Sequence, residues 1–250
     1  MSISSPTLVN LDSQQLNILK PHPALTSLSL IIPAYNDEST IGRLIADSIE
    51  VLNIVCPDYE IIVTNDGSKD STLTILQDWA RKNDRIRIIN HEVNQGFGLT
   101  IKELYYVAQK NAVISLPGDY QYSPKELVKM ANGLNNHDFV IGLRVKRNDP
   151  WRRKLQSAVY NLMLRIIYGH KHKDVNSIKL YKRDILNHIE LRSGTAFVDA
   201  EFCIRTEKAG YRVIEIPIDH LPRLSQGASG GKISVITQTF ADLLNMRSSL

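Results

Sequence analysis

Acidic and amide side chains gather in three short clusters within the first half of the chain. Each cluster directly follows a run of apolar residues that is typical of a buried strand. The clusters are Ala34-Tyr35-Asn36-Asp37-Glu38, Asn65-Asp66-Gly67-Ser68 and Gly118-Asp119-Tyr120-Gln121. In open sheets of parallel strands, ligands bind beyond the carboxyl ends of the strands. We therefore predict that the three clusters meet at one edge of a sheet and form a ligand site.

The third cluster carries side chains that suit a metal ion. Asp119 and Gln121 lie two residues apart on a turn, which presents a carboxylate and an amide oxygen on the same side. Mg²⁺ prefers oxygen ligands and commonly takes only one or two of them from the protein. An aspartate turn that caps the helix begun by Pro124 is the alternative. The residues alone leave both interpretations open.

The second cluster and a pair of glycines are also ambiguous alone. The Asp66 carboxylate can accept a hydrogen bond from a nucleobase N–H or a ribose hydroxyl, yet Asp-Gly-Ser is also a common turn and helix cap. Gly96 and Gly98 lack the third glycine and the acidic residue about 20 positions further on that an NAD site needs. They fit a tight turn as well as the close approach of a ligand.

Strands and helices alternate along the chain from Leu28 onwards. The runs that predict strands are 28–32, 60–64, 86–89, 112–116, 139–143, 179–181 and 212–218. Helical spacing predicts helices over 41–52, 72–80, 99–108, 124–131, 151–167, 198–208 and 233–246, the first of them capped by Ser39 or Thr40. This alternation predicts an α/β fold, a Rossmann-like, doubly wound and mostly parallel sheet with flanking helices.

The composition is that of an ordinary globular domain. Of the 250 residues, 43% are hydrophobic and 22% charged, which excludes a disordered, collagenous or coiled-coil chain. No segment reaches the ~20 apolar residues of a membrane-spanning helix, and residues 1–20 lack the features of a secretory signal. The two cysteines, Cys56 and Cys203, favour a reducing compartment. These features predict a cytoplasmic location.

The net charge of +4 hides an uneven distribution. Residues 35–92 hold six Lys/Arg against eleven Asp/Glu, whereas residues 144–184 hold twelve Lys/Arg against three Asp/Glu. Within the basic stretch, residues 151–167 predict an amphipathic helix that ends at Gly169. We expect such a helix to adsorb to an anionic membrane surface. We expect no nucleic-acid partner, because the basic stretch lacks interleaved aromatic side chains for stacking.

Taken together, the ordered motifs resemble a known family. The first cluster, the second cluster continued to Thr72, Asn94-x-Gly96-x-Gly98 and the third cluster look like family 2 glycosyltransferases of the GT-A fold. The closer resemblance is to the dolichol-phosphate mannose synthase group, the polyprenyl-phosphate glycosyltransferases. It extends from Leu28 to about Lys232. Later segments that match are Gly142-Leu143-Arg144, Trp151-Arg152-Arg153, Asp174-Val175-Asn176-Ser177, Ala209-Gly210-Tyr211-Arg212 and Pro222-Arg223.

The resemblance implies a site for a nucleotide diphosphate sugar. The residues that would line the base and ribose pocket are Pro33, Tyr35, Glu38 and Asp66. Asp119 and Gln121 would hold Mg²⁺ or Mn²⁺ against the diphosphate, so Asp119 counts among both the donor-binding and the catalytic residues. Arg223 would grip the donor phosphates as a loop closes.

The resemblance also implies an acceptor site for the phosphate of a polyprenyl lipid. Arg144, Arg153 and Ser157 would receive that phosphate. The spacing of Arg153 and Ser157 agrees independently, because residues four apart share a helix face. A guanidinium group suits bidentate binding of phosphate. Arg144 and Arg223 complete the catalytic set with Asp119.

The chain departs from the family pattern at two positions. Pro117 stands where the family usually has the first carboxylate of Asp-x-Asp, and Asn65 replaces the first aspartate of Asp-Asp-Gly-Ser. Because Asp119 and Gln121 are retained, we expect metal binding to survive. The departures put donor affinity and sugar choice in question and motivate one alternative, a nucleotide-sugar-binding protein without turnover.

The resulting hypothesis is an inverting, metal-dependent hexosyltransferase that acts from a donor of the GDP-mannose or UDP-glucose type. A polyprenyl or dolichyl phosphate is already anionic near neutral pH, so its oxygen can attack without a general base. The enzyme would be peripheral at the cytoplasmic face of the membrane or held there by an anchoring partner. The other enzymatic alternative is a saccharide hydroxyl acceptor, which needs a base such as Asp199 or Glu201.

The sequence also suggests a division of the chain. Residues 1–27 are a loosely ordered lead-in and residues 28–232 are one glycosyltransferase domain. Within that domain, residues 28–143 are the donor half and residues 144–232 the acceptor half. Residues 233–250 form a C-terminal amphipathic helix in this scheme.

Overall fold

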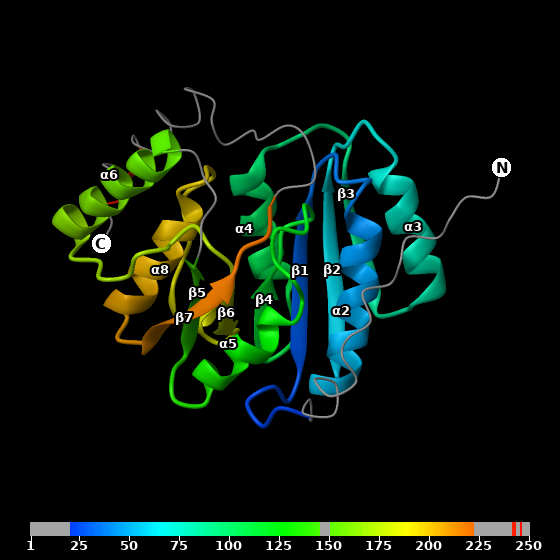
Figure 1. The fold of residues 1–250 in the computed structure, drawn as a ribbon, viewed down its shortest axis with the longest axis horizontal. Helices are drawn as coiled ribbons and strands as arrows, with labels where there is room; N and C mark the ends of the chain where they lie inside the picture. Colours follow the sequence, from blue (N-terminus) through cyan, green and yellow to red (C-terminus); the bar gives the residue numbers. More distant parts are fainter. Residues whose placement is uncertain (1–20, 146–150, 223–241, 244–245, 247–250) are drawn as a thin grey trace.

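The computed structural model describes residues 21–145, 151–222, 242–243 and 246, with the backbone alone for 151–156. The described residues form a seven-stranded sheet in the order β3-β2-β1-β4-β6-β5-β7 (Figure 1). The strands are β1 (Leu28–Ala34), β2 (Tyr59–Asp66), β3 (Ile86–His91), β4 (Ala112–Ser115), β5 (Phe139–Val145), β6 (Lys179–Lys182) and β7 (Val213–Asp219). Only β6 runs antiparallel to its neighbours within this sheet. The predicted mostly parallel sheet is confirmed.

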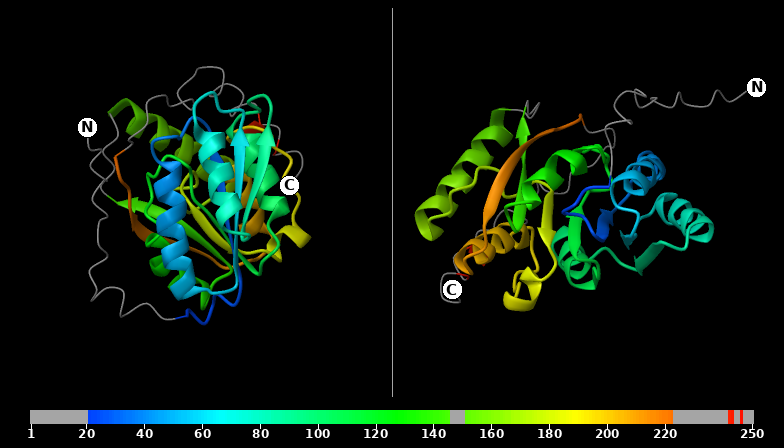
Figure 2. Two further views of the ribbon diagram at one scale, coloured as in Figure 1. Left: turned by 90° about the vertical axis from the view of Figure 1, so that its right-hand side faces the viewer. Right: turned by 90° about the horizontal axis from the view of Figure 1, so that it is seen from below.

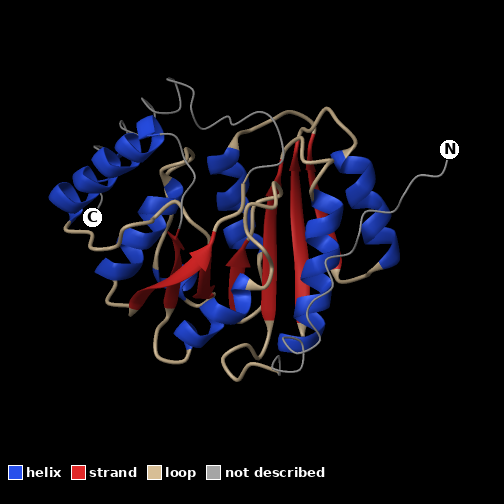
Figure 3. Ribbon diagram, viewed as in Figure 1, coloured by secondary structure: helices blue, strands red, loops and turns tan. Residues whose placement is uncertain are grey.

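Helices pack on both faces of the sheet (Figures 2 and 3). One face carries α2 (Ile41–Val55), α3 (Thr72–Lys82) and α5 (Glu126–Leu134), and the other carries α4 (Phe97–Val107), α6 (Trp151–Tyr168) and α8 (Val198–Lys208). The single-turn α7 (Ile185–His188) follows β6. Side chains alternate along a strand, so Leu30 and Ile32 of β1 enter the first core while Ile31 enters the second.

β1 continues two residues beyond the predicted strand of 28–32. The prediction ended the strand at Pro33 because proline has no N–H to donate to a ladder. The Pro33 carbonyl accepts the N–H of Gly118 at 3.1 Å, so the main-chain polar groups of Pro33 face β4. β4 has already ended at Ser115, opposite Ile31. The missing N–H therefore costs no strand pairing, and β1 pairs with β2 as far as Ala34.

The predicted caps and boundaries have mixed outcomes. Thr40 is the N-cap residue of α2, but its side chain caps no helix N–H; its hydroxyl donates to the carbonyl oxygen of Gly118 at 2.8 Å. α6 ends just before Gly169, whose φ of 71° is left-handed, as the sequence predicts. The helix expected over 233–246 lies outside the described residues except at 242–243 and 246. The division into domains stays a prediction.

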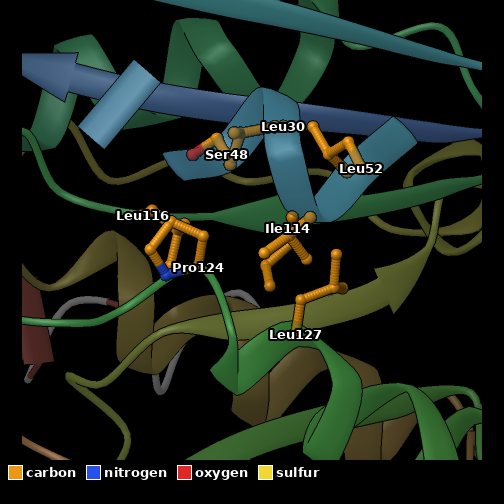
Figure 4. Close-up of a pocket in the computed structure, with 8 residues that line it drawn as sticks. Leu30, Ser48, Leu52, Ile114, Leu116, Pro124 and Leu127 are labelled. Atoms are coloured by element: carbon orange, nitrogen blue, oxygen red, sulfur yellow. The ribbon is translucent and has the colours of Figure 1, made fainter. Parts of the chain in front are cut away.

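A small cavity of about 10 Å³ lies between α2, the sheet and the start of α5 (Figure 4). Its lining residues are Leu30, Ser48, Val51, Leu52, Ile114, Leu116, Pro124 and Leu127. Ser48 is 1% exposed, and its hydroxyl has no hydrogen-bond partner among the described residues. A space of this size takes at most about one water molecule, and its apolar walls offer water few partners. We interpret the cavity as a packing gap.

We predict that Ser48→Ala raises the free energy of unfolding by about 1 kcal/mol. The substitution removes a buried hydroxyl that has no partner, and alanine is the better helix former. Urea unfolding followed by circular dichroism measures the change, with the exposed Ser39→Ala as the control. A loss of stability on Ser48→Ala would mean that the hydroxyl makes a favourable contact and would contradict this interpretation.

Candidate active site

The first two strand-end clusters are joined by hydrogen bonds. They run from Asn36 N to Ser68 Oγ (3.0 Å), Lys69 N to Asn36 Oδ1 (2.8 Å), Glu38 N to Asp70 Oδ2 (3.1 Å) and Ser71 N to Glu38 Oε2 (2.9 Å). Asn36 has a left-handed φ of 54°, a conformation that asparagine adopts more readily than most residues. Glu38 is thereby tied to the start of α3. Tyr35, next to Asn36, leaves 42% of its surface exposed.

The first and third clusters approach so closely that Gly118 has no room for a side chain. A Cβ at Gly118 would lie 2.5 Å from Asp37 Oδ2. Asp37 is buried; its Oδ2 accepts the N–H of Tyr35 at 3.0 Å, and its own N–H donates to Thr72 Oγ1 at 2.9 Å. The Thr40 hydroxyl adds its bond to the Gly118 carbonyl. The three clusters therefore meet at one edge of the sheet, as the sequence predicts.

The turn that carries Asp119 and Gln121 is held in an unusual backbone conformation. The N–H of Gln121 donates to Asp119 Oδ1 at 3.1 Å, and Tyr120 between them has a φ of 56°. The Tyr120 side chain is fixed against α2, because its hydroxyl donates to Asp47 and the Arg43 guanidinium lies 4.7 Å from the ring centroid. The left-handed Tyr120 and its anchors thus set the shape of the predicted metal turn.

The segment after β7 passes beside the same turn. The N–H of Leu221 donates to the carbonyl oxygen of Gln121 at 2.9 Å, and Gln121 Nε2 lies 3.3 Å from His220 Nε2. The His220 ring also packs edge-on against Tyr122, with 5.3 Å between ring centroids. His220 was not predicted from the sequence, because nothing in the spacing connects it to a turn a hundred residues away. Arg223, which was predicted to bind the donor phosphates, lies outside the described residues.

The residues of this turn fit a hard divalent cation. Among the described residues, no group of three or more His, Cys, Asp and Glu side chains could hold a metal ion. The oxygen atoms that this turn offers are the carboxylate of Asp119 and the side-chain amide oxygen of Gln121. Oxygen ligands are what Mg²⁺ and Mn²⁺ prefer, and Mg²⁺ usually completes its shell with substrate phosphates and water. Pro117 adds no ligand.

Asp66 is buried and holds the loop that precedes α4. Its two carboxylate oxygens accept the N–H groups of Gln95 (2.8 Å) and Gly96 (2.9 Å), and Oδ1 also lies 2.9 Å from Nδ1 of His91. The α4 start is close to a neighbouring loop, because a Cβ on Gly98 would lie 2.2 Å from the carbonyl carbon of Thr195. Gly96, with a φ of 89°, therefore forms the turn before α4, and Gly98 allows the backbone at Thr195 to approach.

Asn65 has an unsatisfied acceptor that the sequence did not reveal. Its Nδ2 donates to Asn90 Oδ1 at 2.7 Å, whereas its own Oδ1 has no partner among the described residues. Asn65 is 1% exposed and stands beside Ala34 in the β1–β2 ladder. Buried polar atoms are normally hydrogen-bonded. The sequence signalled this position only as a departure from a family pattern.

Arg144 is clamped by Asp174 at the carboxyl end of β5. Arg144 Nε donates to Asp174 Oδ2 at 2.8 Å, Arg144 Nη2 to Oδ1 at 2.5 Å, and the Arg144 backbone N–H to Oδ2 at 3.1 Å. The Arg144 side chain is 14% exposed and that of Asp174 only 5%. This paired fork is the geometry in which guanidinium and carboxylate interact most strongly. Asp174 belongs to one of the segments that resemble the family, but its pairing with Arg144 was not predicted from the sequence.

Tyr122 directly follows the Asp119–Gln121 turn, and it is close enough to Arg144 for the charge of that side chain to act on its hydroxyl. Its hydroxyl is 3.5 Å from Ser177 Oγ. Burial raises the pKa of Tyr122 to about 12; the positive charge of Arg144 opposes this shift, and the negative charges of Asp174 and Asp119 add to it. The structure therefore brings the predicted metal turn and the predicted acceptor arginine into the same electrostatic environment.

The α6 helix borders this region. Asn161 Nδ2 donates to the carbonyl oxygen of Lys173 at 2.7 Å, next to Asp174. Ser157 lies four residues before Asn161 and therefore shares its face of α6. Arg153 lies one further turn back on the helix, where only the backbone is described. The predicted contact of Arg153 with an acceptor stays a prediction.

The two candidate bases, Asp199 and Glu201, already have strong partners. Asp199 Oδ1 lies 2.9 Å from the ammonium of Lys179 and accepts the Tyr105 hydroxyl at 2.5 Å. Lys179 is 1% exposed, so the Asp199–Lys179 pair is a buried ion pair. Glu201 accepts the backbone N–H groups of residues 192 and 193 and pairs with Arg205 at 2.7 Å.

Residues 29–190 match the model of glycosyl transferase family 2. The match covers more than half of the chain, and the chain therefore belongs to glycosyl transferase family 2. An uncharacterized glycosyltransferase of Synechocystis sp. is 31% identical over 78% of this chain and 62% of its own length. The undecaprenyl-phosphate 4-deoxy-4-formamido-L-arabinose transferase of Proteus mirabilis is 27% identical over 80% and 61%. The chain thus spans about three fifths of these two relatives.

The fold is also that of solved glycosyltransferases. Glucosyl-3-phosphoglycerate synthase from Mycobacterium tuberculosis, in complex with Mn²⁺, UDP and glucosyl-3-phosphoglycerate, superposes with a TM-score of 0.70 at 16% identity. The match covers 100% of this chain and 87% of that one. Its complex with phosphoglyceric acid gives a TM-score of 0.72 over 93% and 84%. The predicted GT-A fold is confirmed.

We predict that Lys179→Met lowers the free energy of unfolding by about 3–5 kcal/mol, because it leaves the buried Asp199 carboxylate without its cation. Adding Asp199→Asn removes the uncompensated charge and should restore most of the loss. Urea unfolding of the two single variants and the double variant measures the coupling between the two residues. Additive losses would contradict the buried ion pair.

Proposed function

We propose that the chain is an inverting, metal-dependent glycosyltransferase that moves a hexose from a nucleotide diphosphate sugar to a polyprenyl or dolichyl phosphate. The observation that carries the proposal is that β7 and the segment after it connect the two predicted sites. Ile218 pairs with Arg144 on β5, and three residues later the N–H of Leu221 donates to Gln121 of the Asp119 turn. The Asp119 turn suits a cation with a diphosphate, and Arg144 suits a second anion. A reaction between two phosphate-bearing substrates needs both within one site.

The donor half of the proposal rests on the joined strand-end loops. The exposed Tyr35 offers a surface for a base, and Pro33 and Glu38 of the same strand-end segment are proposed to line the pocket with it. Asp66 is proposed to line the base and ribose pocket, and its carboxylate also holds the loop at Gln95 and Gly96. The Oδ1 of buried Asn65, which has no hydrogen-bond partner among the residues that the structure describes, lies at the same edge. The base and the hexose are proposed only as a class, of the GDP-mannose or UDP-glucose type.

A divalent ion held by Asp119 and Gln121 would neutralise charge that develops on the departing nucleoside diphosphate. Arg223 is proposed to add positive charge to the same group. Arg144, with Arg153 and Ser157, would orient the acceptor phosphate for attack opposite the leaving group, which inverts the anomeric centre. The attacking oxygen is already anionic, so this chemistry asks no side chain to remove a proton.

Several described contacts favour the phosphate acceptor over a saccharide hydroxyl. A hydroxyl acceptor requires a base, and Asp199 already binds an ammonium and a phenol hydroxyl. Glu201 is occupied in the same way by two backbone N–H groups and Arg205. The relative from Proteus mirabilis is named for an undecaprenyl-phosphate acceptor.

We further propose that α6 contacts the membrane that holds the lipid. No described helix has the combined length and hydropathy to cross a bilayer. On α6, however, Val159, Leu162 and Ile166 are 46%, 55% and 73% exposed. Their spacing of three and four residues puts them on one face. The helix contains no Asp or Glu and several Arg and Lys, which suits the anionic cytoplasmic leaflet.

We predict that the full chain transfers label from one of GDP-mannose, UDP-glucose or UDP-GlcNAc to polyprenyl phosphate when Mn²⁺ or Mg²⁺ is present. EDTA and Asp119→Asn should each abolish transfer, because both remove the cation from the diphosphate. Radiolabel recovered in an organic extract is the measurement. Labelled product on a saccharide hydroxyl would contradict the acceptor, and nucleotide binding without transfer from any donor would favour the non-catalytic alternative.

We predict that Leu162→Glu combined with Ile166→Glu lowers binding to phosphatidylglycerol vesicles roughly tenfold or more, because two apolar side chains lose their burial in lipid. Vesicle flotation measures the bound fraction. Val93→Glu is a matched control, since Val93 is as exposed as Ile166 but lies in the loop after β3. Equal losses in the control and the α6 variant, or no loss in either, would contradict a membrane face on α6.

A further inference from the structure

Four titratable side chains form a buried or half-buried cluster next to the segment that carries Asp174, the partner of Arg144. Glu207 of α8 binds both histidines of the loop that leaves α6: its Oε2 lies 2.7 Å from His170 Nδ1 and its Oε1 lies 2.9 Å from His172 Nε2. On the other side of the ring, His172 Nδ1 lies 3.8 Å from Oε2 of Glu215 on β7. We call His170, His172, Glu207 and Glu215 the His–Glu cluster. None of these four residues has been assigned a role in the site described above.

Glu215 connects this cluster to the acceptor arginine. Its Oε1 accepts the backbone N–H of Lys173 at 2.6 Å and that of Asp174 at 3.0 Å. Asp174 in turn holds the backbone and side chain of Arg144 by three hydrogen bonds. One carboxylate on β7 thus fixes the position of the carboxylate that orients the guanidinium group.

The cluster is charged and has little contact with water. Burial lowers the pKa of His172, but the neighbouring carboxylates of Glu207 and Glu215 outweigh that effect and bring the pKa to about 9. Burial raises the pKa of Glu207, and its bonds with His170 and His172 overcome this and lower the pKa to about 2. His172 and Glu207 are therefore both ionised at neutral pH. The His172 and Glu215 side chains are 17% and 15% exposed, so solvent screens them only weakly.

We propose that Glu215, held by the His–Glu cluster, is a positioning residue that presents Arg144 to the acceptor phosphate through Asp174. The inference rests on the proposed function, in which Arg144 receives that phosphate. The bidentate contact with Asp174 fixes the plane of the Arg144 guanidinium group. A fixed Asp174 therefore sets the orientation of that group before the acceptor arrives, so less conformational freedom is lost on binding.

Steady-state kinetics on the full chain test this proposal. Glu215→Ala should raise the KM for polyprenyl phosphate roughly tenfold or more, the effect expected when hydrogen bonds to a charged group are lost, with kcat and the donor KM nearly unchanged. Glu215→Gln keeps an acceptor oxygen for the two backbone N–H groups and should stay close to wild type. Glu207→Gln, which disturbs the cluster more mildly, should give an intermediate increase.

Glu60→Ala is the matched control. Glu60 accepts the N–H of Gln109 at 2.9 Å and the hydroxyl of Ser29 at 2.6 Å, so it also fixes a loop by two bonds to one oxygen, but at the opposite edge of the sheet. Glu60→Ala should leave the KM for polyprenyl phosphate unchanged, even where it lowers thermal stability as much as Glu215→Ala does. Equal effects of Glu60→Ala and Glu215→Ala on the acceptor KM would overturn the proposal, because they would reflect only a loosened fold.

A measurement without turnover separates this proposal from the proposed function. The Arg144 Nε–H signal in a ¹⁵N–¹H spectrum, assigned with Arg144→Lys, should exchange slowly with solvent in the wild type and faster in Glu215→Ala, but not in Glu60→Ala. Unchanged exchange in Glu215→Ala would refute the positioning. Faster exchange in a protein that glycosylates no polyprenyl phosphate would support the positioning and refute the proposed function.

Discussion

The contact between Gly118 and Asp37 is the constraint on which the rest of the site depends. The buried Asp37 carboxylate occupies the space where any side chain at residue 118 would lie. Asp37 also binds the first loop and the start of α3, so one residue joins the ends of β1, β2 and β4. Because Asp119 follows Gly118 directly, the packing of the Gly118 backbone against the Asp37 side chain sets the position of Asp119 relative to Tyr35 and Glu38. A site for a long, charged donor needs such a fixed distance between its two ends.

The division of charge along the chain corresponds to a division of labour across the sheet. The acidic stretch of residues 35–92 provides the two loops that we assign to the base and ribose of the donor, and the basic stretch of residues 144–184 provides Arg144 and α6. β6 runs antiparallel between β4 and β5 and keeps the two halves in one sheet. The buried Lys179 of β6 pairs with Asp199 of α8 on the side away from α2. Asp199, one of the two candidate bases, thereby joins α8 to β6 through its ion pair with Lys179.

Much of this arrangement follows from local patterns in the sequence. Apolar runs and helical spacing predicted the seven strands and most of the described helices, because the spacing of apolar residues is a local property of the sequence. The meeting of the three clusters followed from the rule that parallel strands end at one edge. Pro33 misled the prediction of β1, since whether a missing N–H matters depends on where the neighbouring strand ends.

What the sequence could not predict are contacts between residues far apart in the chain. The partners of Arg144, Gln121 and Glu215 are 30, 99 and 41 or more residues away in sequence, and no periodicity relates them. The left-handed Tyr120 is equally hidden, because its conformation depends on anchors in α2. The predicted contacts of Arg153 and Arg223 with phosphate remain predictions.

A crystal structure of the chain with Mn²⁺ and a nucleoside diphosphate tests the central claim most directly. The account predicts one ion in contact with Asp119, Gln121 and the diphosphate oxygens, with the base beside Tyr35. An ion bound elsewhere, or a nucleotide seated with its diphosphate away from the Asp119 turn, would contradict it.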